Sequence, residues 1–132
     1  MSERRSVGFV GVGVMGNPMA KQLLAKGHEV IVYDRDDAAQ RAIVDAGAQG
    51  ALSLREVADR TPVVFTSLPS PAAFMEVMVA AGGLREGDAV KIVVDLSTVG
   101  SRATKRAAAD LLAEGVDLID APVSGGAAGA KA

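Results

Sequence analysis

The stretch Gly11-Val12-Gly13-Val14-Met15-Gly16 carries three glycines at the spacing GxGxxG. It follows an apolar run, Ser6–Val10, that reads as a buried strand, and it opens a helix pattern with apolar residues at Met15, Met19 and Leu23. In such a turn Gly11 allows the tight bend, Gly13 lets the backbone approach a pyrophosphate, and Gly16 lets the helix lie close to the strand. The helix N-terminus adds N–H groups and a partial positive charge. The spacing alone fits two interpretations: a turn that binds the phosphates of a dinucleotide, and an ordinary tight turn, which glycines also mark.

A second apolar run, residues 30–33, ends in Asp34. A carboxylate at the tip of the second strand is placed to accept hydrogen bonds from the hydroxyls of an adenosine ribose. A simpler interpretation is that Asp34, Asp36 and Asp37 only start the next helix, with one of them as its N-cap. The order of strand, glycines, helix, strand and acid favours the dinucleotide-binding interpretation.

Strand and helix patterns alternate along the rest of the chain. Helix patterns cover residues 37–46 and 101–114. A brief helix is expected from Ser53, which has capping-box spacing to Glu56. A further helix has one apolar face, formed by Phe74, Val77, Met78 and Ala81. Strand patterns cover 49–51, 63–66, 92–95 and 116–120, and helix ends are marked by Gly47 and by Gly82-Gly83. Strands separated by helices imply right-handed crossovers. We therefore expect one domain over residues 1–132, an α/β fold of the Rossmann type: doubly wound, with a mainly parallel sheet and helices on both faces.

Small polar residues follow several of these strands, at the edge where a parallel sheet binds its ligands. The segments are 67–71 (Ser-Leu-Pro-Ser-Pro), 96–98 (Leu-Ser-Thr) and 121–126 (Ala-Pro-Val-Ser-Gly-Gly). Each segment alone has an ordinary structural explanation as a loop, a helix cap or a flexible turn. Their common position at one edge of the sheet favours a binding site.

Composition and charge limit the classes of protein to which this chain can belong. The chain of 132 residues has a formal net charge of −2, which provides no basic surface for nucleic acid. It has no cysteine, which excludes disulfides and thiolate metal sites and fits a reducing compartment. The sequence has no signal-peptide pattern, and no apolar stretch is long enough to span a bilayer. We therefore expect a cytoplasmic protein with no metal site, no nucleic-acid partner and no membrane contact.

Residues 8–16, together with Met19-Ala20 and Gly27-His28, resemble the start of the β-hydroxyacid dehydrogenases, the family of 3-hydroxyisobutyrate and 6-phosphogluconate dehydrogenases. Residues 68–69, 95–98 and 120–126 resemble three further blocks of that family, so the resemblance spans essentially the whole chain. The resemblance implies a cofactor site made of Gly11, Val12, Gly13, Val14, Met15, Gly16, Asp34, Arg35, Leu68, Pro69 and Thr98. It also implies that the substrate carboxylate is held by Ser124, Gly125 and Gly126, because two glycine N–H groups and a hydroxyl form a small anion cradle.

The resemblance further implies hydride transfer between nicotinamide and a small 3-hydroxy acid or semialdehyde, in a full-length protein that is a homo-oligomer. The family's catalytic lysine and its all-helical second domain are absent from this chain, and none of the lysines present carries the family's lysine motif. We therefore expect this chain alone to bind cofactor without turnover. Where the family has a proline, this chain has Ser101, a mild change at a helix entry. The single histidine, His28, lies in a turn before the second strand and is expected to be structural.

The expected cofactor is NAD, with NADP as the alternative. Asp34 favours NAD because a carboxylate repels a 2′-phosphate. Arg35 favours the alternative, since a guanidinium stacks on adenine or pairs with that phosphate. Two other functions stay open: an NADPH-dependent semialdehyde or imine reductase of the same family, and a nucleotide-binding module without catalysis.

Overall fold

The computed structural model describes residues 6–13, 15–79, 83–97 and 101–121. Its strands are β1 (Ser6–Val10), β2 (Glu29–Tyr33), β3 (Gln49–Gly50), β4 (Val63–Thr66), β5 (Ile92–Asp95) and β6 (Asp117–Asp120). Its helices are α1 (Gly16–Ala25), α2 (Asp37–Asp45), α3 (Leu54–Arg60), α4 (Pro71–Met78), the short 3-10 helix η1 (Leu84–Glu86) and α5 (Ser101–Ala113).

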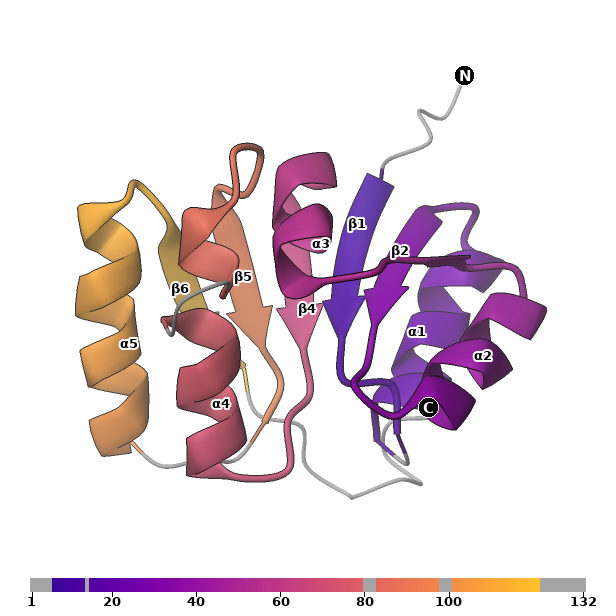
Figure 1. The fold of residues 1–132 in the computed structure, drawn as a ribbon, viewed down its shortest axis with the longest axis horizontal. Helices are drawn as coiled ribbons and strands as arrows, with labels where there is room; N and C mark the ends of the chain where they lie inside the picture. Colours follow the sequence, from indigo (N-terminus) through magenta and orange to yellow (C-terminus); the bar gives the residue numbers. More distant parts are fainter. Residues whose placement is uncertain (1–5, 14, 80–82, 98–100, 122–132) are drawn as a thin grey trace.

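The strands form one parallel sheet in the order β3-β2-β1-β4-β5-β6, and the arrows of β1, β2, β4 and β5 in Figure 1 point the same way. β1 lies between β2 and β4. The chain therefore adds β2 and β3 on one side of β1, and then β4, β5 and β6 on the other side. The helices that follow these two neighbours leave the sheet on opposite faces. This is the topological switch point, at which doubly wound folds bind their ligands.

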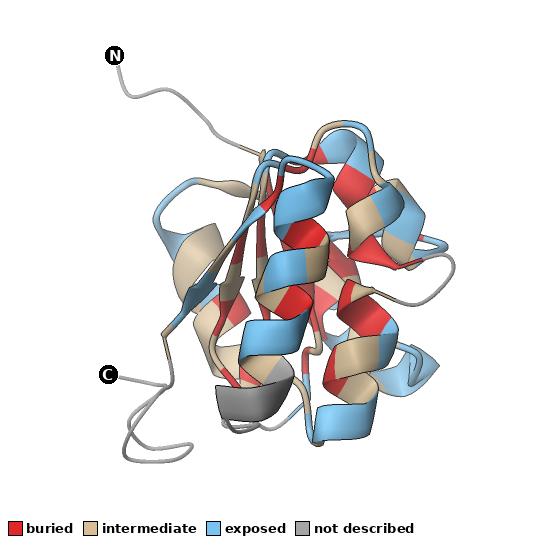
Figure 2. Cartoon of the chain, turned by 90° about the vertical axis from the view of Figure 1, so that its left-hand side faces the viewer, coloured by how far each residue is buried: buried red, intermediate tan, exposed pale blue. Residues whose placement is uncertain are grey.

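Two hydrophobic clusters hold the helices against the sheet. Successive strand residues point to opposite faces, so Val7 and Phe9 of β1 pack with α1 and α2, while Val10 packs with α3, α4 and α5. Figure 2 shows the sheet from its edge, with buried residues between the layers and exposed ones on the outer helix surfaces. The expectation of a Rossmann-type parallel sheet with helices on both faces is confirmed.

Element positions agree with the sequence patterns to within a residue or two, and three details differ. The strand expected over 49–51 has only two residues, and the helix face expected to include Ala81 ends at Met78 with Val79 as its C-cap. Ala81 and Gly82 lie outside the described residues, whereas Gly83 is the N-cap of η1. That helix has no counterpart in the sequence analysis, because three residues are too few to show a period. Among the described residues, no helix is long and apolar enough to cross a membrane.

Candidate functional site

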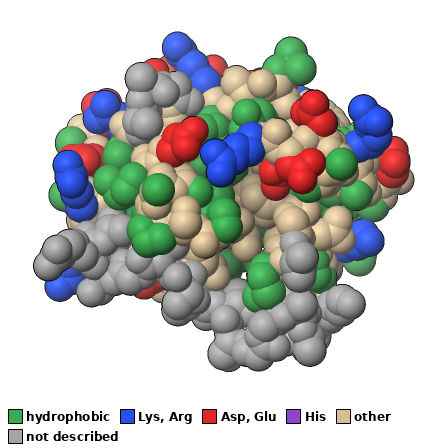
Figure 3. All heavy atoms as spheres, turned by 60° about the horizontal axis from the view of Figure 1, so that its bottom comes forward, with side chains coloured by type: hydrophobic (Ala, Val, Ile, Leu, Met, Phe, Trp, Pro, Cys, Tyr) green, Lys and Arg blue, Asp and Glu red, His purple; other side chains and the backbone are tan. Residues whose placement is uncertain are grey.

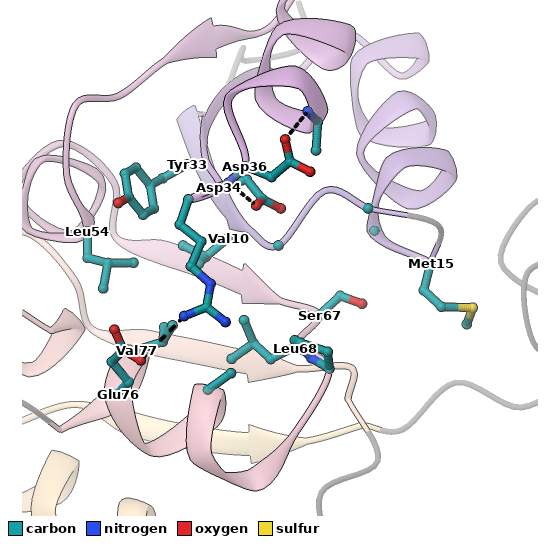
Figure 4. Close-up of a pocket in the computed structure, with 17 residues that line it drawn as sticks. Val10, Met15, Tyr33, Asp34, Asp36, Leu54, Ser67, Leu68, Glu76 and Val77 are labelled. Atoms are coloured by element: carbon teal, nitrogen blue, oxygen red, sulfur yellow. Dashed lines mark hydrogen bonds and ion pairs between the residues drawn. The ribbon is translucent and has the colours of Figure 1, made fainter.

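A cavity of about 480 Å³ lies at the carboxyl ends of β1, β2 and β4, at the switch point of the sheet (Figure 4). This volume falls within the range of small-molecule sites. The cavity is lined by Val10, Gly11, Gly13, Met15, Gly16, Tyr33, Asp34, Arg35, Asp36, Ala39, Leu54, Ser67, Leu68, Pro69, Ala73, Glu76 and Val77.

The three glycines of the β1–α1 turn meet three different surroundings. Gly11 has a φ of +90°, and a Cβ atom there would lie 2.1 Å from the carbonyl oxygen of Ser67. A Cβ atom at Gly16 would lie 1.8 Å from the carbonyl oxygen of Gly11, inside the contact between α1 and its own strand. A Cβ atom at Gly13 would meet no heavy atom of the described residues within 4 Å. Gly11 and Gly16 are therefore required by the fold itself, whereas Gly13 borders open space in the cavity.

The N-terminus of α1 differs from those of α2, α3 and α4. Side-chain oxygens cap α2, α3 and α4, from Asp36, Ser53 and Ser70 respectively. The N-cap of α1 is Met15, and no side chain caps this helix. An uncapped N-terminus retains its attraction for an anion. The open space at Gly13 and the uncapped helix together fit a pyrophosphate held by backbone N–H groups.

The sequence left open whether the acids after β2 cap the next helix or face a cofactor. In the structure, different residues take these two positions. Asp36 is the N-cap of α2, and its carboxylate accepts hydrogen bonds from the N–H groups of Ala38 and Ala39. Asp34 instead faces the glycine turn. Its Oδ2 accepts from the N–H of Val12 at 2.9 Å and its Oδ1 from the N–H of Asp36 at 2.9 Å. Asp34 therefore joins the glycine turn to the end of β2 and remains on the cavity wall.

The opposite wall is held by hydrogen bonds between the ends of β4 and β5. The N–H of Leu68 donates to Oγ of Ser97 at 2.6 Å, and that hydroxyl donates to Oδ1 of Asp95 at 2.7 Å. The same Oδ1 accepts from the hydroxyl of Thr66 at 2.8 Å. These bonds fix the loop that carries Leu68 and Pro69 along the cavity.

Asp95 is fully buried, and its Oδ2 has no hydrogen-bond partner among the residues that the structure describes. Burial raises the pKa of this carboxyl, and the nearby carboxylate of Asp120 raises it further, against the lowering effect of the bonds from Ser97 and Thr66. In the sequence, Asp95 belongs to the segment 95–98, and no local pattern predicts a role for it. Only its burial beside β4 identifies it as a structural link.

Arg35 and Glu76 form an ion pair across the mouth of the cavity, with 3.7 Å between Nη1 and Oε2. Figure 4 draws this pair as a dashed line beside Glu76 of α4. Figure 3, which brings the carboxyl edge of the sheet forward, shows acidic and basic side chains lying side by side there. The described edge is therefore mixed in charge.

Most of the residues expected to hold a cofactor lie around this one cavity. Those that line it are Gly11, Gly13, Met15, Gly16, Asp34, Arg35, Leu68 and Pro69. Val12 has a buried side chain and takes part through its backbone N–H, which binds Asp34. Five expected residues lie outside the described ones: Val14, Thr98, Ser124, Gly125 and Gly126. The cavity also includes residues that the sequence analysis did not single out as cofactor-binding, among them Tyr33, Leu54, Ala73, Glu76 and Val77.

Two further features concern titratable residues. His28 lies between α1 and β2, at the amino edge of the sheet, and its buried Nδ1 has no hydrogen-bond partner in the described part of the chain. Within the part of the chain that the structure describes, no group of three or more His, Cys, Asp or Glu side chains is placed to hold a metal ion.

Comparison with known proteins places this geometry in a family. Residues 6–132 match the model of the NAD-binding domain of 6-phosphogluconate dehydrogenase. A curated relative, 2-(hydroxymethyl)glutarate dehydrogenase of Eubacterium barkeri, is 38% identical over 133 residues, which covers 100% of this chain and 44% of the relative.

Solved structures agree with the sequence match. The 3-hydroxyisobutyrate dehydrogenase of Mycobacterium tuberculosis with L-serine superposes with a TM-score of 0.90 at 28% identity, covering 98% of this chain and 44% of that one. Psf3 in complex with NADP+ and 2-OPP superposes with a TM-score of 0.86 at 31% identity, covering 95% and 45%. The chain thus spans less than half the length of these relatives.

Proposed function

The chain belongs to the family of the NAD-binding domain of 6-phosphogluconate dehydrogenase, and we propose that it is the cofactor-binding domain of an oxidoreductase acting on a small 3-hydroxy acid. The observation that carries the proposal is the β1–α1 turn. Its helix N-terminus is uncapped, its Gly13 borders open space, and Asp34 stands beside it. These are the parts that a dinucleotide requires.

We assign the cofactor contacts as follows. The turn from Gly11 to Gly16 holds the pyrophosphate through backbone N–H groups. Asp34 accepts hydrogen bonds from the ribose hydroxyls, and Leu68, Pro69 and Thr98 line the cofactor. The nicotinamide supplies the hydride acceptor or donor when it is bound.

The substrate site is proposed from the last segment of the chain. Ser124, Gly125 and Gly126 form the cradle for the substrate carboxylate. The proton of the substrate hydroxyl is exchanged by a lysine that this chain does not contain. We therefore propose that residues 1–132 form a single dinucleotide-binding domain that binds cofactor, and that these residues by themselves do not turn over substrate, because they do not supply the proton donor.

We propose NAD as the preferred cofactor, because Asp34 borders the cavity where a 2′-phosphate would approach a carboxylate. A second candidate is an NADPH-dependent semialdehyde or imine reductase. The observation that favours it is Arg35, which also lines the cavity and whose guanidinium suits a phosphate.

A pair of fluorescence titrations with NADH and NADPH tests the proposal. The chain contains no Trp, so nicotinamide emission is read without protein interference. Saturable NADH binding with clearly weaker NADPH binding supports the proposal, and tighter NADPH binding favours the reductase. Binding of neither nucleotide, in a chain that circular dichroism shows to be folded, contradicts both.

A further inference from the structure

The charges around the cavity mouth are unequal. Of the lining residues that the structure describes, Arg35 is the single cation, whereas Asp34, Asp36 and Glu76 are acids. The guanidinium of Arg35 faces the carboxylate of Glu76 at 3.7 Å. Among the described lining residues, the one cation available to an additional phosphate is therefore already paired with an anion.

Packing of α4 against the core fixes where the backbone of Glu76 lies. Ser70 caps α4 by accepting a hydrogen bond from the N–H of Ala73 at 3.1 Å. Phe74, Val77 and Met78 bury one face of the helix in the core. This packing leaves Glu76 on the exposed side of α4 and still on the cavity wall. The packing of α4 therefore holds the backbone of Glu76 beside the mouth of the cavity, within reach of Arg35.

We propose that Glu76 is a specificity residue that disfavours a 2′-phosphate on the cofactor by holding Arg35 away from it. This inference rests on the proposed function, because it assumes that the adenosine half of a dinucleotide occupies this cavity. A phosphate monoester carries between one and two negative charges at neutral pH and binds best to a free guanidinium. To bind a 2′-phosphate, Arg35 must break its ion pair with Glu76. The phosphate must then lie among the carboxylates of the three acids that line the cavity. A 2′-hydroxyl requires no break in this ion pair and adds no negative charge beside the carboxylates.

The size of the effect follows from exposure. The side chains of Arg35 and Glu76 are 73% and 64% exposed, so water and salt screen their attraction. A pair of this kind changes an equilibrium by roughly two- to fivefold. Glu76 therefore adjusts a preference whose larger part comes from Asp34.

The test compares Glu76→Gln with the wild-type chain, using NADH and NADPH as probes and nicotinamide fluorescence as the readout. The control is Glu114→Gln, which changes the net charge equally at an exposed position outside the cavity lining. We expect Glu76→Gln to strengthen NADPH binding roughly two- to fivefold, while NADH binding changes much less and Glu114→Gln leaves the ratio of the two affinities unchanged. An unchanged ratio in Glu76→Gln overturns the inference.

A second comparison tests the role of Arg35. In an Arg35→Ala background, Glu76→Gln should strengthen NADPH binding clearly less than it does in the wild type, because no guanidinium remains to be released. An equal gain in both backgrounds means that Glu76 acts by its charge alone and overturns the proposed role. Wild-type chain that is folded but binds neither nucleotide contradicts the proposed function instead, so the two failures are distinguishable.

Discussion

Asp34 contributes to both the fold and the proposed cofactor site. Each of its carboxylate oxygens accepts one backbone N–H, from Val12 and from Asp36. A carboxylate has about four acceptor positions, so two remain for ligand hydroxyls on the cavity side. The same residue thus sets the position of the glycine turn and remains able to accept from a ribose.

We predict that Asp34→Asn weakens NADH binding about tenfold, the effect of one charged hydrogen bond worth about 1.5 kcal/mol. NADPH binding should weaken less, because the repulsion of its phosphate is removed at the same time. Nicotinamide fluorescence titrations measure both affinities. The matched control is Asp37→Asn, an exposed acid outside the cavity lining. Equal losses in the two variants would contradict the role of Asp34.

Gly11 gives a prediction on stability. An alanine there adopts a φ of +90° and places its Cβ 2.1 Å from the carbonyl oxygen of Ser67. The left-handed backbone and the overpacking together should lower the free energy of unfolding by about 2–5 kcal/mol. Urea denaturation of Gly11→Ala followed by circular dichroism measures the loss. A denaturation midpoint equal to that of the wild type would show that the turn has a different geometry.

At this scale, the glycine spacing and Asp34 were predictable because neighbours along the chain define them. Glu76 was not, since its contact with Arg35 exists only after α4 and β2 have been placed on the same sheet. The two acids after Asp34 show the limit of local reasoning. Sequence alone offered any of the three as a helix cap, and the structure assigns that role to Asp36.

Among the secondary-structure elements, the ends of β4 and β5 are joined by one buried carboxyl. Asp95 accepts hydrogen bonds from Thr66 of β4 and from Ser97, whose hydroxyl in turn accepts from Leu68. Loss of this link would free the loop that forms one wall of the cavity. Asp95 pairs in register with Asp120 of β6, so the link lies beside a second carboxyl.

The pKa of Asp95 gives a pH prediction. Because this pKa is raised in the folded chain, the folded state holds more protons than the unfolded state between a pH of about 4 and the folded pKa. The contribution of Asp95 to stability is therefore greatest below that pH, falls as pH rises through the folded pKa, and is constant above it.

Urea denaturation of wild type and Asp95→Asn over a range of pH measures this contribution. We expect the free energy of unfolding of the wild type, minus that of the variant, to fall as pH rises above about 4. The asparagine keeps an oxygen acceptor and does not titrate, so it supplies the reference. A difference that rises with pH would mean that the pKa of Asp95 is lowered by folding.

Helices and strands followed from periodicity wherever they were long enough to show it. The helix from Ser53 followed from its cap, and Ser53 does accept a hydrogen bond from the N–H of Glu56 at 3.1 Å. In a capping box, the carboxylate of Glu56 would accept from the N–H of Ser53. In this structure its Oε1 accepts instead from the N–H of Leu52. A spacing rule identifies the capping residues, but the angle at which the chain enters the helix selects the donor.

For the whole molecule, the strand order explains why the site lies where it does. α1 leaves β1 toward one face of the sheet and α4 leaves β4 toward the other, which opens a crevice between neighbouring carboxyl ends. Alternating strands and helices predicted this arrangement, because right-handed crossovers permit few others. The composition of the cavity wall was beyond such rules, since Leu54, Ala73 and Val77 come from helices whose rotation depends on core packing.

The most direct test of the account separates folding from binding with two alanine variants. Gly13 borders open space without a positive φ, so Gly13→Ala should leave stability within about 0.5 kcal/mol of wild type. Gly115 also has open surroundings but a φ of +79°, at the amino edge of β6, so Gly115→Ala should cost about 1 kcal/mol.

The measurement is the NADH affinity of these two variants and of the wild type, by nicotinamide fluorescence, with urea denaturation of each chain. We predict that Gly13→Ala loses at least about tenfold in NADH affinity, because its methyl group occupies the space where the backbone approaches the pyrophosphate. Gly115→Ala should be less stable and bind NADH as the wild type does. Wild-type affinity in a folded Gly13→Ala chain would contradict the assignment of this turn as the dinucleotide site.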